Sequence, residues 1–243
     1  MIARDKIINF INDYLDIEAA PEQNGLQVEG TDKIHKIAFG VSANLDTFKA
    51  AHKLGADMII VHHGLIWDKP QQISGVFGER VKFLIKNDIN LAAYHLPLDM
   101  HKVVGNNASL AKLIGLKSLK PFGDYHGLKI GVKGVFPTSQ SIEDICKILG
   151  GDCLLTGKEK VKTAAIVSGG AHDMVEQAIK EGVDLFITGT RDEYIVSLCT
   201  EAEINFITMG HYNSEKFGIR ELERIVKNIF AVDTVIIEEK NPF

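Results

Sequence analysis

The segment KIAFGVSANLDTFKAAHKLGADMIIVHH (residues 36–63) has a second copy in the same chain, KTAAIVSGGAHDMVEQAIKEGVDLFITGT (residues 162–190), once one residue of slippage is allowed. Each copy contains a short apolar run ending in Val-Ser, a small-residue loop, an amphipathic stretch, a Gly, an Asp and a second apolar run. This order is typical of a strand, a helix and a second strand. The sequence therefore predicts a β-α-β unit that occurs twice.

The repeat continues downstream of both copies. DINLAAYHLPLD (residues 88–99) corresponds to EINFITMGHYNSE (residues 203–215), and each contains an apolar strand followed by His-x-x-x-carboxylate. His95 and Asp99 thus correspond to His211 and Glu215. Two such copies favour an α/β fold with two parallel-rich sheets covered by helices, and with functional groups at the carboxyl ends of strands.

The border between the two halves is expected near residue 125, where FGDYHG interrupts the periodic pattern. A closing helix, Ser214 to Ile229, and a final strand, Thr234 to Ile237, are expected to pack back on the first half. The first repeat would then comprise residues 1–125 and 214–243, and the second would comprise residues 126–213.

The composition is that of an ordinary globular protein: 243 residues, 45% hydrophobic and 24% charged. The first residues mix charges into helical spacing and no apolar run approaches a membrane span, so we expect a cytoplasmic protein without a membrane partner. Three cysteines with no C-x-x-C spacing predict neither a disulfide framework nor a thiolate zinc site.

The charge is unevenly distributed along the chain. The net charge of -5 argues against a dedicated nucleic-acid binder, yet residues 112–162 hold nine lysines against five acids. This basic middle region keeps an anionic partner possible.

The stretch MIIVHHGLIW (residues 58–67) ends a predicted strand on two adjacent histidines. Neighbours on a regular strand point to opposite faces, so His62 and His63 can serve one site only where the strand ends, and Gly64 permits a turn there. Either histidine alone is more often structural than a ligand. Together with carboxylates, however, imidazoles suit zinc, iron, manganese or nickel, and a bridging carboxylate allows two cations to sit about 3.5–4 Å apart.

The two His-x-x-x-carboxylate motifs supply such carboxylates. His211 and Glu215 would share one face of a helix that starts there, although a capping box by Ser214 or Asn213 with a solvated glutamate is the alternative. In HLPLD, Pro97 and Leu98 make a helix improbable. We expect Asp99 to be a third ligand, and His95 and His101 to orient ligands or move protons.

A strand also runs into a helix through two glycines at VSGGA (residues 167–171). The amides of Ser168, Gly169 and Gly170 could bind a phosphate, but a tight β-α turn is the favoured alternative.

The chain resembles the Nif3-like family, also known as DUF34 or as GTP cyclohydrolase 1 type 2 homologs. The resemblance covers nearly the whole chain, and HHG, HLPLD and GHY-x-x-E in that order are its specific motifs. The matching segments, three of which contain these motifs, are NGLQVEG (residues 24–30), IIVHHGLIW (59–67), YHLPLDMHKVVGNN (94–107), SGGA (168–171), TG (188–189) and GHYNSE (210–215).

The resemblance implies a Nif3-like fold of two intertwined α/β repeats, with mixed, mostly parallel sheets covered by helices. It also implies two divalent cations per subunit, with His62 and His63 binding different cations, Asp99 and His211 adding one ligand each, and Glu215 bridging. The resemblance further implies a ring-shaped homohexamer, a trimer of dimers, with its metal sites facing an internal cavity.

Two segments depart from the family pattern. Glu22-Gln23 stand where many relatives carry Trp-Asp, and we expect this change to affect packing. TRDEY (residues 190–194) lacks a histidine that often follows the TG motif, and we expect this change to remove either a proton donor or a group that orients a metal ligand.

The resulting hypothesis is a dinuclear metal-dependent hydrolase acting on a nucleotide such as GTP or on a cyclic amide, with His95 moving protons. The alternative is a non-enzymatic ring that binds nucleic acid or a nucleotide and uses its metals for structure or regulation. A metal chaperone or storage protein is a third interpretation.

Overall fold

The computed structural model describes residues 1–241, which fall into two compact units. Met1–Leu98 and Ile219–Lys240 make the first unit, and Asp99–Gly218 make the body of the second. The first unit is therefore discontinuous in sequence, because the chain leaves it after residue 98 and returns at residue 219.

The first unit contains a five-stranded sheet in the order β13-β4-β5-β6-β2. Its strands are β13 (Asp233–Ile236), β4 (Lys36–Ser42), β5 (Met58–His63), β6 (Asn90–Ala93) and β2 (Gly25–Val28). All neighbours are parallel except β2, which is antiparallel to β6. The apolar residues of β4 and β5 are almost all buried, as expected for parallel strands covered on both faces.

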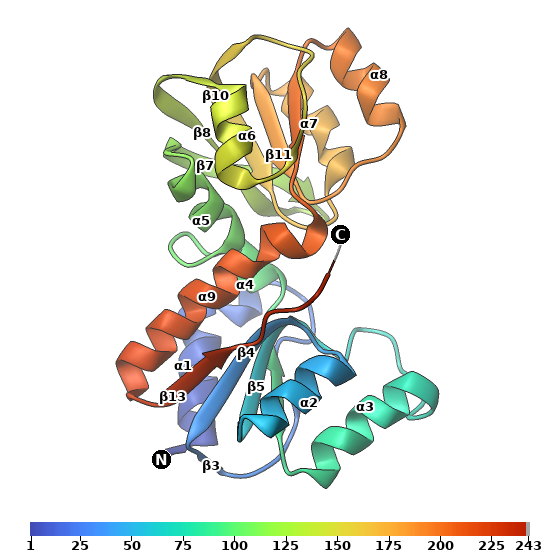
Figure 1. Cartoon of the computed structure of the whole chain (residues 1–243), viewed down its shortest axis with the longest axis vertical. Coiled ribbons are helices and arrows are strands. Elements are labelled where there is room, and N and C mark those ends of the chain that lie inside the picture. The colour runs from blue at the N-terminus through green and yellow to red at the C-terminus, as the bar shows by residue number, and fades with distance from the viewer. Residues whose placement is uncertain (242–243) are drawn as a thin grey trace. The chain divides into compact units, whose positions relative to one another are not determined.

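Helices α2 (Leu45–Lys53) and α3 (Gly75–Lys86) cover one face of this sheet (Figure 1). Their side chains Phe48 and Leu84 share a buried cluster with alternate residues of the strands, and the Asn44 side chain caps α2 by accepting from the Thr47 amide at 2.9 Å.

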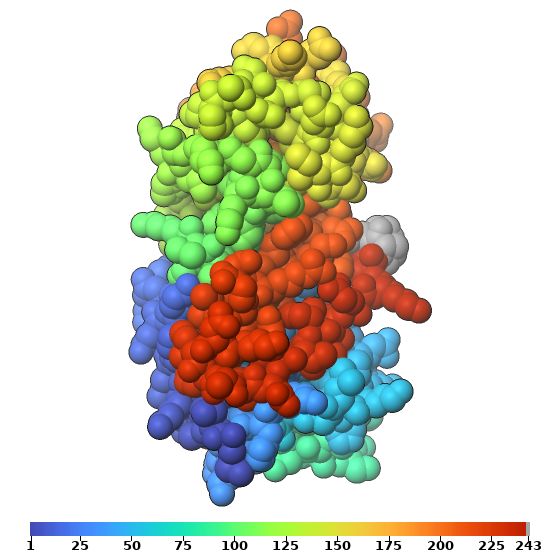
Figure 2. Space-filling view, turned by 60° about the vertical axis from the view of Figure 1, so that its left-hand side comes forward, coloured from blue at the N-terminus to red at the C-terminus, as the bar shows by residue number. Residues whose placement is uncertain are grey.

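Helix α1 (Arg4–Leu15) packs against the C-terminal part of α9 (His211–Phe230), where the Phe10 and Phe230 rings lie 5.4 Å apart. Figure 2 shows this return of the chain as red residues lying against blue ones. A short 3₁₀ helix, η1 (Ile17–Ala19), follows α1, and β1 (Ile2–Ala3) pairs with β3 (Lys33–Ile34).

The second unit contains a six-stranded sheet in the order β7-β8-β10-β11-β12-β9. Its strands are β7 (Lys117–Tyr125), β8 (Leu128–Ser141), β10 (Lys160–Val167), β11 (Leu185–Thr188), β12 (Asn205–Thr208) and β9 (Asp152–Leu154). The pairs β10-β11 and β11-β12 are parallel and the other three pairs are antiparallel. The mixed α/β architecture is as predicted, but this second sheet is not mostly parallel.

The helices of the second unit are short. They are α5 (Asn106–Leu113), α6 (Ile142–Leu149), η2 (His172–Met174), α7 (Val175–Lys180) and α8 (Tyr194–Glu201). Within the described part of the chain, none of the helices combines the length and apolar character that crossing a bilayer requires.

The FGDYHG interruption is a β-hairpin turn inside the second unit. Tyr125 pairs with Leu128, and the two residues between them, His126 and Gly127, have φ values of 52° and 88°. Two consecutive positive φ values are characteristic of the turn that fits the twist of a two-residue hairpin. The loss of periodicity at this point therefore marks a change from β7 to β8.

Two polar side chains recur at equivalent places in the two sheets. The Asp57 carboxylate accepts the amides of His35 and Lys36, and the Asp184 carboxylate accepts those of Lys162 and Thr163. Both carboxylates thereby tie the start of one strand to its parallel neighbour, close to where the pairing of the two strands begins. The duplication seen in the sequence is thus present in hydrogen bonding as well as in strand order.

Two local predictions are wrong. The segment Leu96–Met100 is a short helix, α4, because Pro97 stands in its first turn, where the missing N–H has no intrahelical acceptor to lose. Helix α9 begins at His211, three residues before the predicted start at Ser214.

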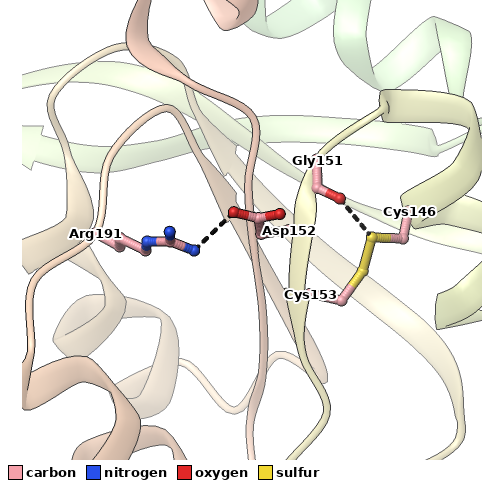
Figure 3. The surroundings of a disulfide bond; sticks show 5 residues. All are labelled: Cys146, Gly151, Asp152, Cys153 and Arg191. Atoms are coloured by element: carbon pink, nitrogen blue, oxygen red, sulfur yellow. Dashed lines mark hydrogen bonds and ion pairs between the residues drawn. A yellow bond between two sulfur atoms is a disulfide. The ribbon is translucent and has the colours of Figure 1, made fainter. Parts of the chain in front are cut away.

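A third prediction, that the cysteines form no disulfide, is also wrong. Cys146 of α6 and Cys153 of β9 form a disulfide across a sequence separation of 7 (Figure 3). Cys199 is a buried thiol. Burial raises the pKa of the Cys199 thiol to about 11, which makes it a weak nucleophile.

Candidate metal centre

His62 and His63 lie at the carboxyl end of β5, as their position in the sequence predicts. His62 is fully buried, and its Nδ1 lies 2.9 Å from the carbonyl oxygen of Tyr94. A carbonyl only accepts, so Nδ1 carries the proton and Nε2 carries the lone pair that can bind a cation. This hydrogen bond is the kind that fixes the orientation of a metal-binding histidine.

His95, two residues after the end of β6, completes a group of three imidazoles in the first unit. Its ring centroid lies 5.0 Å from that of His62 and 5.5 Å from that of His63, and the ligand nitrogens of the three residues lie within 4.8 Å of one another. The Trp67 ring meets His95 edge-on at 5.1 Å. The neighbouring parallel strands β5 and β6 therefore bring these side chains together at one sheet edge.

Gly64 is required by close packing rather than by its backbone conformation. A Cβ at this position would lie 2.4 Å from Gln27 Oε1 and 2.7 Å from Ala93 Cβ. The same Gln27 oxygen accepts the amides of Leu65 and Ile66 at 2.8 and 3.1 Å. The chain thus turns away from β5 along a side chain of β2.

Glu22 is a functional candidate that the sequence did not reveal. Its carboxylate lies 3.0 and 3.1 Å from His95 Nδ1 and accepts the Leu96 amide at 3.2 Å. Burial raises the pKa of Glu22, but the hydrogen bond and charge of His95 outweigh it, so the net effect lowers that pKa. Glu22 was expected to affect packing, and the structure adds a contact that orients His95.

In the second unit, His211 and Glu215 lie one turn apart at the start of α9. His211 Nε2 is 3.2 Å from Glu215 Oε2, and the carboxylate is buried whereas the imidazole is partly exposed. Ser214 does not cap the helix, since its amide already donates to the Gly210 carbonyl and its hydroxyl donates to the His211 carbonyl at 2.8 Å. The glutamate is not the solvated member of a capping box.

Asp99 is held by two side chains of the second unit. Its Oδ1 accepts from Asn106 Nδ2 at 2.8 Å and from Ser168 Oγ at 3.0 Å. A carboxylate oxygen of Asp99 lies within 4.8 Å of one of Glu215, and the two residues are only 7% and 3% exposed. Two buried carboxylates at this separation repel each other unless a proton or a cation compensates their charge.

The glycine loop after β10 does not offer the predicted phosphate site. The Ser168 amide donates to Asn107 Oδ1 at 2.7 Å and the Gly169 amide donates to Ser214 Oγ at 2.9 Å. Gly170 lies against the His211 ring, which an added Cβ would approach to 3.4 Å. The anion-binding prediction for Ser168, Gly169 and Gly170 is therefore replaced by a packing role, because two of these amides are already used.

His101 has a local role. Its Nδ1 accepts the amides of Val103 and Val104 at 3.3 and 3.1 Å, which shapes the turn before α5. The prediction that it orients a ligand finds no support in these contacts.

The comparisons with known proteins cover the whole chain. The family model described as Duf34/NIF3 (NGG1p interacting factor 3) matches residues 2–242. A relative from Pyrococcus horikoshii named GTP cyclohydrolase 1 type 2 homolog is 41% identical over 246 residues, which cover 97% of each chain.

Two solved structures extend this similarity to three dimensions. TTHA1606 from Thermus thermophilus has a TM-score of 0.91 at 33% identity and covers 100% of both chains. Reduced HcgD from Methanocaldococcus jannaschii has a TM-score of 0.87 at 25% identity and covers 98% of both chains.

Proposed function

Because the chain belongs to the Duf34/NIF3 family, we propose that it is a metal-dependent hydrolase that binds two divalent cations. The proposed ligands are His62, His63, Asp99, His211 and Glu215. The name of its relatives, GTP cyclohydrolase 1 type 2 homolog, suggests a purine nucleotide such as GTP as substrate, and a cyclic amide is the alternative.

The observation that carries this proposal is the pair of buried carboxylates, Asp99 and Glu215, with oxygens within 4.8 Å of each other. Keeping two carboxylates ionised at this separation and burial costs several kcal/mol without a compensating positive charge. Imidazole nitrogens with carboxylate oxygens form the donor set preferred by zinc, iron, manganese and nickel. The side chains present therefore fit divalent cations.

When bound, such cations supply a water molecule of lowered pKa and positive charge near the developing negative charge. The chain's own residues prepare the ligands: the Tyr94 carbonyl fixes the His62 tautomer, while Asn106 and Ser168 orient the Asp99 carboxylate. These hydrogen bonds reduce the reorganisation that binding would otherwise require.

His95 is suited to proton transfer because of its fixed orientation. Glu22 accepts from its Nδ1, so its Nε2 is the nitrogen left to give or take a proton at a substrate.

The basic region gives little support to the nucleic-acid alternative. Four of its lysines pair with carboxylates, namely Lys129 with Asp124, Lys133 with Glu181, Lys147 with Asp144 and Lys158 with Asp184. These pairs reduce the positive charge available to phosphates.

A homohexameric ring, also proposed from the family resemblance, would give a light-scattering mass about six times the 26.8 kDa of one chain.

The test is elemental analysis of purified protein together with nucleotide and cyclic-amide hydrolysis assays. His63→Ala and Glu215→Ala should lose both bound metal and hydrolysis, while any salt-dependent DNA binding persists. His52→Ala, which removes an exposed imidazole from α2, is the matched control and should retain both. Full metal content in both His63→Ala and Glu215→Ala would refute the proposal.

A further inference from the structure

A cavity of about 350 Å³ opens in the second unit beside His211. It lies where the parallel strands β11 and β12 end, and where the antiparallel strand β9 starts with Asp152 paired to Thr208. Carboxyl ends of parallel strands are the usual place for ligand sites in open α/β sheets. Four glycines leave parts of its wall without side chains, namely Gly150, Gly151, Gly189 and Gly210.

An ion pair stands between this cavity and a smaller one of about 160 Å³. Arg191 Nη1 lies 2.7 Å from Asp152 Oδ2 (Figure 3). Both residues line both cavities. The smaller cavity adds apolar walls from Ile195, Val196 and Phe206. The pair therefore stands where a cavity of mixed lining meets a mostly apolar one.

The backbone of Asp152 is firmly held. It pairs with Thr208 in the sheet, and the next residue, Cys153, is joined by the disulfide to Cys146 of α6 (Figure 3). The side chains of Asp152 and Arg191 remain 73% and 64% exposed, so their pairing contributes little to stability. An exposed pair with one member, Asp152, on a held strand can exchange its mutual contact for contacts with a ligand.

The chemistry of the pair selects the class of ligand. A guanidinium beside a carboxylate presents N–H donors next to acceptor oxygens, and this pattern complements a ring edge in which an N–H is adjacent to a C=O. Arginine donates to the O6 acceptor of guanine in protein–DNA complexes, so a guanidinium is a suitable donor to such a ring carbonyl, while a carboxylate can accept from the neighbouring ring N–H. A phosphate fits less well, because Asp152 already balances the charge of Arg191 and Asp192 follows directly in the chain.

We propose that Asp152 and Arg191 bind the amide edge of a planar cyclic amide, such as the N1–H and C6=O edge of a guanine ring, in the cavity beside His211. This inference rests on the proposed function and names the substrate class of the same site. The cavity volume lies in the range of small-molecule sites, roughly 300–1,000 Å³. Asp152 accepts from the ring N–H and Arg191 donates to the ring carbonyl.

The first test compares four nucleosides on the wild-type, metal-loaded protein by isothermal titration calorimetry. Guanosine and inosine retain the amide edge, whereas 1-methylguanosine lacks its N–H and adenosine lacks both groups. Losing a hydrogen bond to a charged partner reduces affinity by roughly tenfold to a hundredfold. We expect guanosine and inosine to bind more tightly than the other two by this factor.

The second test repeats the titrations with Asp152→Ala and Arg191→Ala. Each should weaken guanosine binding at least tenfold and leave metal content, measured by elemental analysis, unchanged. Arg220→Ala is the matched control, since it breaks an exposed arginine–carboxylate pair with Glu238 of similar length, 2.6 Å, in the first unit. It should bind guanosine as the wild type does.

Equal affinity for guanosine and 1-methylguanosine would overturn the inference, as would unchanged binding in Asp152→Ala and Arg191→Ala or no binding of any nucleoside. Failure of the metal proposal is distinguishable, because it would appear as metal-free wild-type protein. Selective guanosine binding by such metal-free protein would support the inference by itself.

Discussion

The substitution Gly169→Ala adds a single methyl group, which should displace two proposed metal ligands without changing the ligand side chains themselves. The φ of Gly169 is +71°, and a Cβ built there would lie 2.2 Å from Glu215 Oε1 and 3.3 Å from His211 Nε2. In Gly169→Ala, the Glu215 carboxylate must move by about 1 Å away from the new methyl group to reach ordinary van der Waals separation. Disturbing the arrangement of metal ligands in this way lowers metal affinity by about 10- to 100-fold.

The same substitution also costs stability through the backbone. An alanine in the left-handed region costs about 1–2 kcal/mol, which corresponds to a Tm decrease of roughly 2–8 °C for a chain of this size. The displaced atom is the end of a side chain, so its movement adds little to this cost. Thermal unfolding measures the backbone effect, and titration of metal against a chelator measures the ligand effect.

Gly182→Ala separates the two effects. Gly182 has a similar φ of +66°, but an added Cβ would meet nothing within 4 Å. This control should lose about the same stability as Gly169→Ala and bind metal like the wild type. Equal metal affinity in Gly169→Ala and Gly182→Ala would refute the reasoning, because the contact with Glu215 would then have no consequence.

Three further predictions concern the stability of the second unit. Asn205→Ala should lower the free energy of unfolding by about 3 kcal/mol in a urea titration. The buried side-chain amide of Asn205 makes hydrogen bonds to the backbone of Thr156, Gly157, Lys158 and Asp184, and all of them would be lost. A loss below about 1 kcal/mol would contradict this prediction. Burial raises the pKa of Asp184, but Lys158 and the amides of Lys162 and Thr163 outweigh it and lower the pKa below its usual value of about 3.9. This stabilisation is complete above that value and disappears as pH falls through the folded pKa, so Asp184→Asn should be less stable than the wild type at neutral pH and nearly equal at about pH 2. Removing the Cys146–Cys153 cross-link, which closes a short loop of sequence separation 7, should cost about 2.5 kcal/mol, and thiol titration of the unreduced, unfolded protein should detect Cys199 alone. Three reactive thiols there would contradict the disulfide.

The sequence was most informative where a local pattern determines the structure. Apolar runs such as Met58–Val61 predict buried strands, and the repeat predicts their parallel order, because a β-α-β crossover permits little else. The β-α-β pattern of the repeat does not predict the antiparallel strands β7 and β8, which lie outside it. The turn between these two strands was therefore interpreted from the sequence as a border between the halves. The disulfide was missed for a related reason, since it depends on β9 lying beside α6.

Long-range partners of the site were the least predictable. Glu22 and His95 are 73 residues apart, and no spacing rule connects them. Their contact exists because β2 pairs with β6 in antiparallel orientation, which places the segment before β2 next to the residue after β6. A departure from a family pattern beside a candidate site could have drawn attention to Glu22, because a carboxylate there has an imidazole within reach.

The duplication explains why one fold could supply both ligands and a cavity. Asp57 and Asp184 hold the same pair of parallel strands together in each copy. The residues at the carboxyl ends of these strands can therefore differ between the copies while the β-α-β unit is retained. The first copy ends β5 in His62-His63 and places imidazoles at the sheet edge, whereas the second ends β11 in Thr188 followed by Gly189 and leaves that edge open. Small residues at the equivalent place are what allow a cavity beside His211. The second copy could therefore bind a substrate at the position where the first copy would bind a cation.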